Sequence, residues 1–357
     1  MTDLPRSGDP CVAVVPAPLY TVLVNWNGWE DTIACVRSLR AAEHGDLIVV
    51  ACDNASTDGS ADRLTEWADA TLCRAPPQTA RLPVDRARHI TEWVAPDRAG
   101  FRFVLIENDD NLGFAGGNNV GIALALADPA CRHVFLLNND TEIAPDALTA
   151  LTTKAEADRS LAVIGATLVF HEQPDRVQGL GAAYDRKRAR ARTLFAGGAL
   201  AALPHVDAIE REIEYVIGAA MFIRADVLRR TGGLSEAYFL YYEELDFAQR
   251  LLPGERQGWA PGAVIRHKVG GSIGTGRVRA RPSNISLYYD HRSKIRFYRA
   301  HCRSMTPFLA AALAKTMLAY LRRGDVVAVR VILCAIRDYA RQPKDYRADL
   351  SRFAKPK

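Results

Sequence analysis

The sequence predicts an α/β protein with a mainly parallel central sheet flanked by helices, followed by a basic helical extension. Two observations predict this fold class. Strand-like apolar runs alternate with segments of helical spacing four times in the first half of the chain, and such alternation indicates parallel strands joined by right-handed crossovers. The residues from Arg277 to Lys357 are helical in pattern and hold 19 Lys and Arg against five Asp and Glu.

Each strand–helix unit of the first half has its own signal. Continuous apolar runs rich in β-branched residues predict buried strands, and apolar residues three or four apart predict the helices between them. The expected strands are 19–25, 47–52, 103–106 and 134–137, and the expected helices are 29–42, 60–68, 118–127 and one beginning near Pro145. Residues 74–100, which are rich in Pro and Arg, are expected to form an irregular insertion.

The second half predicts a mixed pattern of strands and short helices. We expect strands at 161–170 and 214–224 and one that ends at His267, with helices at 225–230, within 241–251 and from 284 onward. Residues 171–210 are variable in character and basic around DRKRARAR.

Composition and length limit the class of protein. The 357 residues are 48% hydrophobic and 24% charged, as in globular proteins with one large or two smaller domains. Apolar stretches near 305–321 and 326–336 are interrupted by Lys315 and Arg330, so we expect no membrane span. The N-terminal residues do not resemble a signal peptide. None of the seven cysteines forms a Cys-x-x-Cys pair, which favours reduced thiols in a cytoplasmic protein.

The charge is divided unevenly along the chain. The whole chain carries +5 and the segment from Arg277 carries +14, so residues 1–276 carry −9. A basic end on an acidic body indicates an anionic partner for that end, either membrane lipid or nucleic acid.

Polar clusters follow four of the predicted strands. They are Asn25-Trp26-Asn27, Asp53-Asn54, Asn111-Leu112-Gly113 and Asn138-Asn139-Asp140. Because ligands of parallel α/β sheets bind beyond the carboxyl ends of the strands, these clusters predict one binding site along one edge of the sheet.

Several of these residues have both a functional and a structural interpretation. Asp140 can hold a divalent cation, but Asn and Asp are also common in turns at strand ends. For Asp53 we favour a functional role, in which its carboxylate accepts a hydrogen bond from a nucleobase. The small residues between Asn111 and Asn119 allow close approach of a phosphate or sugar to a helix N-terminus. Neither they nor Gly271–Gly276 match the dinucleotide-binding G-x-G-x-x-G pattern, which excludes a nicotinamide enzyme.

Three acids lie within four residues at Glu243, Glu244 and Asp246. They can mark a solvated helix start, but the preceding aromatic FLYY favours a general base beside an apolar wall. On a helix Glu243 and Asp246 share one face and Glu244 points elsewhere, so spacing alone leaves the identity of the base open. His267 can supply a nitrogen ligand to a cation or be structural.

Six ordered segments closely resemble bacterial family 2 glycosyltransferases of the GT-A fold, notably the rhamnosyltransferase-like branch. They are VLVNWN, ACDNASTDGS, ENDDNLGFAGGNN, LLNNDTEIAPDAL, IGAAMFIRADVLRRTGGLSEAYFLYYEELDFAQR and VIRHKVGGS. The resemblance covers roughly residues 20–272. It implies inverting transfer of a sugar from a nucleotide-diphospho-sugar, of dTDP-rhamnose or UDP-sugar type, to a hydroxyl of a glycan or lipid-linked acceptor in cell-surface polysaccharide synthesis. It also implies a divalent cation, Mg²⁺ or Mn²⁺.

The resemblance also implies roles for individual residues. Glu244 matches the second acid of the family's Glu-Asp pair and is the expected base, with Glu243 and Asp246 on the acceptor side. Asp140 and His267 are the expected metal ligands, although the family's Asp-x-Asp motif is Asn-Asn-Asp here. The expected nucleotide-sugar-binding residues are Asn25, Asn27, Asp53, Asn111, Gly117, Asn118, Asn138 and Asn139.

The resemblance divides the chain into three parts. We expect an N-terminal extension at 1–18, a glycosyltransferase domain at 19–275 with a nucleotide-binding half (19–140) and an acceptor and catalytic half (141–275), and a basic helical tail at 276–357. Residues 171–210 are expected to shape the acceptor side. The tail is expected to lie on the anionic inner face of the membrane or to form a packing arm, and no nucleic-acid-binding motif is present.

Two other classes of function stay open. A sugar nucleotidyltransferase needs a Gly-rich loop with Lys or Arg after the first strand, and VNWNGWEDT lacks one. A non-catalytic nucleotide-sugar-binding protein is supported only by the Asn-Asn-Asp variant. The sequence predicts no oligomeric state.

Overall fold

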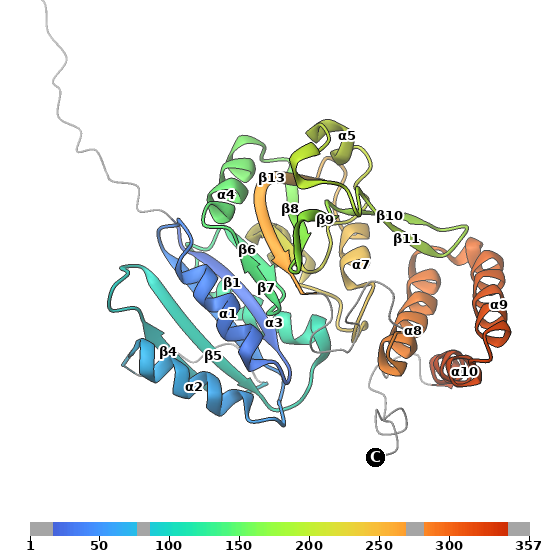
Figure 1. The fold of residues 1–357 in the computed structure, drawn as a ribbon, viewed down its shortest axis with the longest axis horizontal. Coiled ribbons are helices and arrows are strands. Elements are labelled where there is room, and N and C mark those ends of the chain that lie inside the picture. Colours follow the sequence, from blue (N-terminus) through green and yellow to red (C-terminus); the bar gives the residue numbers. More distant parts are fainter. Residues whose placement is uncertain (1–16, 77–85, 269–281, 342–357) are drawn as a thin grey trace, which may run out of the picture.

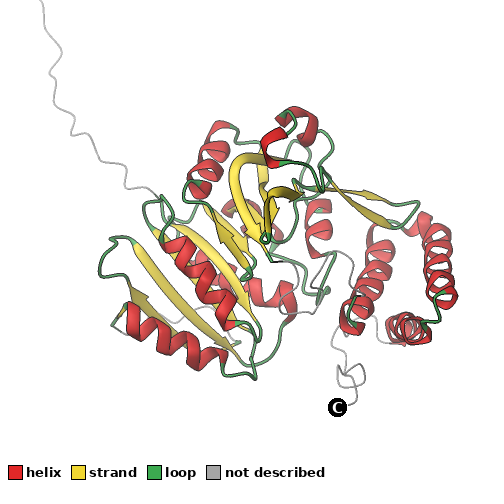
Figure 2. Cartoon of the chain, in the orientation of Figure 1, coloured by secondary structure: helices red, strands yellow, loops and turns green. Residues whose placement is uncertain are grey.

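The computed structural model describes residues 17–76, 86–268 and 282–341, and one large sheet flanked by helices forms its body (Figures 1 and 2). The three C-terminal helices lie together at one end of this body. Most of the predicted N-terminal extension, the Gly271–Gly276 loop and the end of the predicted tail lie outside the described residues.

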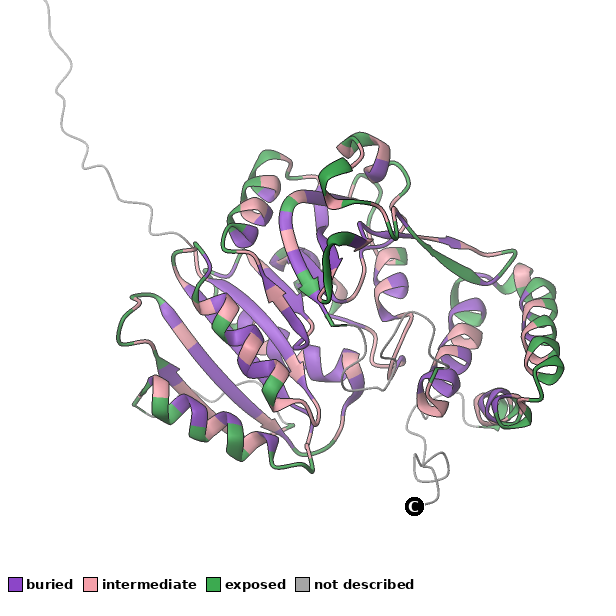
Figure 3. Ribbon diagram, in the orientation of Figure 1, coloured by how far each residue is buried: buried purple, intermediate pink, exposed green. Residues whose placement is uncertain are grey.

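Four parallel strands form the first half of the sheet, in the order β5-β2-β1-β6. All seven residues of β2 are buried, because helices cover both faces of the sheet (Figure 3). This buried position explains the continuous apolar sequence of these strands. The strands are β1 (Leu19–Asn25), β2 (Leu47–Asp53), β5 (Phe101–Asn108) and β6 (His133–Leu137), and the helices are α1 (Trp29–Arg40), α2 (Ser60–Thr71) and α3 (Gly113–Ala127).

Two expectations for this half are wrong. Residues 74–100 contain an edge strand, β4 (Ala87–Val94), which pairs antiparallel with β5 and with the short β3 (Cys73–Arg74). Only Trp93 of β4 is buried, and a half-exposed edge strand lacks the apolar run of a central one.

Helix α3 begins at Gly113, five residues before the expected start. Its glycines let the helix lie close to the sheet: a Cβ at Gly121 would come within 2.4 Å of Cγ1 of Val22. Close packing therefore offsets the low helix propensity of glycine at this position.

The second half extends the sheet mostly by antiparallel pairs. Its order continues β6-β12-β8-β13-β7, with β9 beside β8, and only β8 and β13 are parallel. The predicted α/β class is confirmed, and the sheet as a whole is mixed. The strands are β7 (Thr141–Ile143), β8 (Leu161–Phe170), β9 (Gln173–Gly179), β12 (Ala220–Arg224) and β13 (Arg256–His267), and the helices are α4 (Ala147–Ala157), α5 (Val206–Glu210), α6 (Ala225–Thr231) and α7 (Glu243–Gln249).

Strand β12 is shorter than expected. The expected strand began at residue 214, but the structure places the first residue of β12 at Ala220. Residues 214–219 leave the sheet and run toward a separate hairpin, where Ala182 bridges to Tyr215. That hairpin consists of β10 (Ala182–Asp185) and β11 (Arg190–Thr193).

The C-terminal helices are α8 (Asn284–His301), α9 (Thr306–Arg322) and α10 (Val326–Arg341). Helix α8 packs on the body: the ring of Tyr289 stacks on Phe239 at 4.6 Å, and Ser293 Oγ donates to the carbonyl of Leu240 at 2.9 Å. Tyr184 of the hairpin contacts Phe297 of α8 with ring centroids 5.6 Å apart. The hairpin, α7 and α8 are therefore held together by buried aromatic side chains.

Helix α9 differs from the other helices in its exposure. The segment Arg303–Arg322 is long and apolar enough to cross a membrane by length and composition alone, with a mean hydropathy of 1.2. The expectation of no membrane span stays a prediction. Leu309 and Leu313 are the buried residues of α9, and most of the helix is exposed in Figure 3.

Candidate active site

The carboxyl ends of β1, β2 and β6 are joined by a buried network of side chains. Asn25 Nδ2 donates to Asp53 Oδ1 at 2.6 Å, and Asn25 Oδ1 accepts from Thr32 Oγ1 at 2.8 Å. Asn139 Nδ2 in turn donates to Thr32 Oγ1 at 2.9 Å. The structure thus brings together three of the four predicted polar strand ends through the side chain of Asn25.

Asp53 is buried and accepts several hydrogen bonds. Besides Asn25, its oxygens accept from the backbone N–H of Ser56 at 3.0 Å and from Ser56 Oγ at 2.6 Å. Asn27, whose φ of 53° is left-handed, accepts from the backbone N–H of Thr57 at 2.8 Å. These bonds fix the β1 and β2 loops against each other and orient the Asp53 carboxylate.

The residues predicted to bind phosphate or sugar at the start of α3 have structural contacts. Asn118 is buried and donates to the carbonyl of Phe114 at 2.9 Å, and Asn111 accepts from the backbone N–H of Gly113 at 2.9 Å. A Cβ at Gly117 would lie 2.8 Å from the amide of Asn54. The glycine therefore permits close packing of α3, and the binding roles of Asn111, Gly117 and Asn118 stay predictions.

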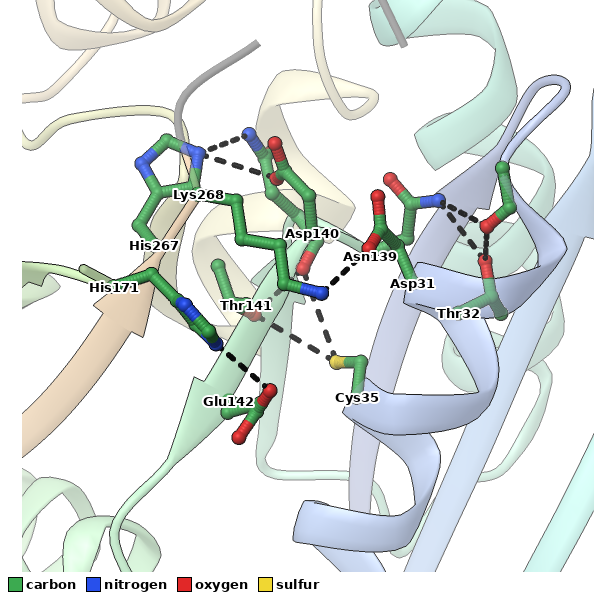
Figure 4. A network of polar contacts seen from close by, with 12 residues as sticks. Asp31, Thr32, Cys35, Asn139, Asp140, Thr141, Glu142, His171, His267 and Lys268 are labelled. Atoms are coloured by element: carbon green, nitrogen blue, oxygen red, sulfur yellow. Dashed lines mark hydrogen bonds and ion pairs between the residues drawn. The ribbon is translucent and has the colours of Figure 1, made fainter. Parts of the chain in front are cut away.

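The predicted metal ligands meet at the end of the sheet (Figure 4). Nε2 of His267 lies 3.2 Å from Oδ1 of Asp140, and both side chains are more than nine-tenths buried. The other ring nitrogen, Nδ1, lies 2.9 Å from Oε1 of Gln178 on β9. Asn138 Nδ2 lies 3.4 Å from His267 Nε2.

This arrangement fits a divalent cation. When Nδ1–H of His267 donates to Gln178, the Nε2 lone pair faces the carboxylate of Asp140, and two facing electron-pair donors suit a shared cation. Within the described ranges, no group of three or more His, Cys, Asp and Glu side chains could hold a metal. A cation at Asp140 and His267 would therefore take further ligands from donor phosphates and water, as Mg²⁺ commonly does.

Neighbouring charges are arranged around this pair. Lys268 Nζ donates to Asp31 Oδ1 at 2.7 Å, and this hydrogen bond raises the pKa of Lys268. Figure 4 shows Glu142 directed toward His171 rather than toward His267. Oε1 of Glu142 lies 3.0 Å from Nε2 of His171. Asp31 therefore offsets the positive charge of Lys268 close to the Asp140–His267 pair.

The acids of α7 follow a strained turn. Tyr241 and Tyr242 have φ values of 67° and 73°, a conformation that costs non-glycine residues about 1–3 kcal/mol each. The turn directs the side chain of Glu244 into a cavity and places Glu244 beside Gly218. A Cβ at Gly218 would lie 3.8 Å from Glu244 Cδ and 3.8 Å from the ring of Phe114 on α3.

The three acids differ in their surroundings. Burial raises the pKa of Glu244 to about 7. Burial, and then the charge of Glu244, raise the pKa of Glu243 well above its usual value. Both carboxyl groups have a buried Oε2 without a hydrogen-bond partner in the described part of the chain.

Asp246 has a structural environment. Its Oδ2 lies 3.0 Å from Arg250 Nε, and its Oδ1 lies 2.8 Å from His301 Nε2 at the end of α8. Asp246 thus points toward α8, whereas Glu244 lines the cavity.

Comparisons with known proteins agree with this geometry. A model of the family "Glycosyl transferase family 2" matches residues 83–200. The low-salt glycan biosynthesis hexosyltransferase Agl10 of Haloferax volcanii is 28% identical over 162 residues, which are 45% of this chain and 48% of that protein. Both matches cover less than half of the chain, and both support its resemblance to family 2 glycosyltransferases. The chain spans about half the length of this curated relative.

A solved glycosyltransferase structure shares the fold of this chain. A structure of GalNAc-T7 with UDP, GalNAc and Mn²⁺ has a TM-score of 0.54 at 11% identity, covering 82% of this chain and 50% of that chain. The mannosyltransferase PcManGT of Pyrobaculum calidifontis, in complex with GDP-Man and Mn²⁺, has a TM-score of 0.46 at 15% identity, covering 91% and 81%. The first likeness and the observed topology confirm the GT-A fold.

Sequence reasoning missed several residues near the site. Lys268 directly follows His267, and its position could have been noticed from that strand end. Gln178 lies in the segment expected to shape the acceptor side, and no local pattern marks it as a partner of His267. Thr32 lies on the buried face of α1, where helical spacing indicates packing rather than a network to Asn139.

Proposed function

We propose that this glycosyltransferase domain transfers a sugar, with inversion, from a nucleotide-diphospho-sugar to an acceptor hydroxyl. The observation that carries this proposal is the pairing of two distinct sites: a buried Asp140–His267 pair suited to a cation, and a carboxyl group, Glu244, whose pKa is raised to about 7. A base with a pKa near the working pH is the most effective proton acceptor.

Glu244 is the proposed base and Glu243 is not. Burial, and then the charge of Glu244, raise the pKa of Glu243 well above its ordinary value and disfavour the ionised form that a base needs. Glu244 lines a cavity that can admit an acceptor. Its carboxylate can accept the proton of the acceptor hydroxyl while the hydroxyl oxygen attacks the anomeric carbon and the nucleoside diphosphate leaves. Gly218 leaves room beside the carboxyl group, between Glu244 and the start of α3.

The donor is proposed to bind along the strand ends. Asp53 is held by Asn25 and Ser56 in an orientation suited to accept a nucleobase N–H, and Asp140 with His267 would hold Mg²⁺ or Mn²⁺. Such a cation offsets the charge of the leaving diphosphate. We propose dTDP-rhamnose or a UDP-sugar as the donor, and a glycan or lipid-linked molecule of cell-surface polysaccharide synthesis as the acceptor.

We also propose that α9 lies on the cytoplasmic face of an anionic membrane. Its large apolar side chains Phe308, Leu318 and Leu321 are 43–51% exposed, and Lys315 and Arg322 lie on the same helix. Exposed apolar side chains with flanking cations suit an anionic lipid surface. Leu309 and Leu313 are buried against the hairpin and α8, and this contact favours a peripheral helix over one that spans the bilayer.

The donor proposal is tested with a panel of nucleotide-sugars, with and without Mg²⁺ or Mn²⁺. We expect metal-dependent binding and slow hydrolysis of one donor class, and loss of both in Asp140→Ala with an unchanged circular dichroism spectrum. Wild-type-like turnover of that variant would remove the metal assignment. Donor binding without hydrolysis or transfer to any acceptor would favour a non-catalytic binding protein.

A further inference from the structure

A cavity of about 350 Å³ lies between α7, the β10–β11 hairpin and α8. Glu244 lines it together with the rings of Tyr184, Tyr215, Tyr241 and Tyr242. Aromatic walls with a few convergent polar groups are typical of small-molecule sites. The cavity also receives charged side chains from outside the sheet, from the hairpin and from α8.

The arginines of the hairpin differ in whether they form an ion pair. Arg186 pairs with Glu214, Arg188 with Asp185 at 2.7 Å, and Arg192 with Glu212 at 2.8 Å. Arg190 is exposed, lines the cavity and makes no ion pair with the described residues. A guanidinium without an acidic partner at the wall of a cavity is suited to bind a carboxylate or phosphate in the fork geometry of arginine.

Helix α8 contributes a second polar group to the cavity. Lys294 Nζ lies 3.0 Å from Asp290 Oδ2, one helical turn away, and both residues line the cavity. The ion pair offsets the charge of Lys294, so Arg190 is the cation among the described lining residues that has no ion-pair partner. Asp290 and Lys294 together offer an acceptor and donors for the hydroxyl groups of a sugar.

We propose that this cavity binds an acceptor sugar that carries an anionic group. Arg190 holds the anionic group, and Glu244 accepts the proton of the acceptor hydroxyl. The α8 pair Asp290–Lys294 contacts the other hydroxyls of the sugar. This inference rests on the proposed glycosyl transfer and adds the charge class of the acceptor. The anion is a carboxylate on the sugar itself or a phosphate that links the sugar to a carrier.

The test measures binding of three probes to the full chain by ligand-observed NMR. Methyl glucoside is neutral, glucuronic acid carries a carboxylate, and glucose 1-phosphate carries a phosphate. The variants are Arg190→Gln and the matched Arg188→Gln, whose arginine lies on the same hairpin and is already paired. Since a phosphorylated sugar resembles part of a donor, each titration is repeated with Mn²⁺ and a saturating nucleoside diphosphate.

We expect wild-type protein to bind at least one anionic probe about tenfold more tightly than methyl glucoside, as for one charge-assisted contact at a partly exposed site. Arg190→Gln loses this preference and Arg188→Gln keeps it. Preference for glucuronic acid indicates an acidic sugar, and preference for glucose 1-phosphate indicates a phosphate-linked one. Equal binding of the three probes, no binding of any, or equal effects of both variants overturns the proposal.

Nucleoside diphosphate binding is measured on the same three proteins. If no nucleotide binds any of them, the proposed donor site is wrong, whatever the probes show. If nucleotides bind all three equally and Arg190 has no effect on the probes, only the inference about the acceptor fails.

Discussion

Replacement of Glu244 by Gln is expected to abolish transfer and to stabilise the protein at the same time. The side chain keeps its shape but loses the ability to accept a proton. Because general-base catalysis contributes about 10²–10⁴-fold, transfer is expected to fall by that factor. In the wild type, kcat/KM is expected to rise with pH up to about 7, where the Glu244 carboxyl ionises, and then to level off.

The gain in stability follows from the same pKa. Burial raises the pKa of Glu244 from an ordinary value of 4.5 to about 7 in the folded state. The unfolded chain releases this proton at lower pH, so the wild type loses stability as pH rises from 4.5 to 7. At about 1.4 kcal/mol per pKa unit, the penalty above pH 7 approaches about 3 kcal/mol. Glu244→Gln removes this loss of stability.

The assay is urea unfolding of wild type, Glu244→Gln and Glu66→Gln at pH 4.5 and pH 8. Glu66 is an exposed control on α2 that forms a surface ion pair with Arg63, and its replacement is expected to change the free energy of unfolding by less than about 0.5 kcal/mol. Glu244→Gln is expected to match wild type at pH 4.5 and to exceed it at pH 8. Equal stability at both pH values would refute the raised pKa, and full transfer activity would move the base to another residue.

Three further outcomes are expected. Gln178→Leu weakens Mn²⁺ binding about 10- to 100-fold, measured by electron paramagnetic resonance, while Gln178→Glu retains an acceptor for His267 Nδ1 and binds normally; equal affinities would show that Gln178 does not orient the ring. Asp246→Asn weakens the contacts with Arg250 and with α8 and lowers the free energy of unfolding by about 1–3 kcal/mol, and an unchanged urea midpoint would contradict this. Leu318→Glu reduces sedimentation with anionic vesicles more than with neutral ones, whereas Ala310→Glu, on the same exposed helix, is the control for added charge alone.

The sequence predicted the parts of the fold that depend on local pattern. Continuous apolar runs marked the buried strands β1, β2 and β6 because both faces of these strands are covered. Strand β4 was missed because an edge strand needs only one buried face, and its single buried residue, Trp93, leaves no apolar run. The start of α3 was missed because glycine lowers local helix propensity, while close packing requires it there: a Cβ at Gly117 would lie 2.8 Å from the amide of Asn54.

Prediction of the site was limited by long-range contacts. Strand ends and family motifs predicted the Asp140–His267 pair, which the structure places 3.2 Å apart. Its orienting partner Gln178 lies on another strand, and no spacing in the sequence connects the two. The same limit applies to Asp290 and Lys294, which reach the cavity from α8 only through tertiary packing.

The Asn25 network has a consequence for how nucleotide and cation affect each other's affinity. Asn25 touches Asp53, the proposed nucleobase residue, and connects through Thr32 to Asn139, the neighbour of Asp140. A ligand that orders one of these loops lowers the entropy cost of ordering the other. Thermodynamic linkage makes that coupling reciprocal, so nucleotide must tighten cation binding by the same factor by which the cation tightens nucleotide binding. In Asn25→Ala this coupling is then expected to weaken, and the direct contact of the diphosphate with the cation accounts for what remains.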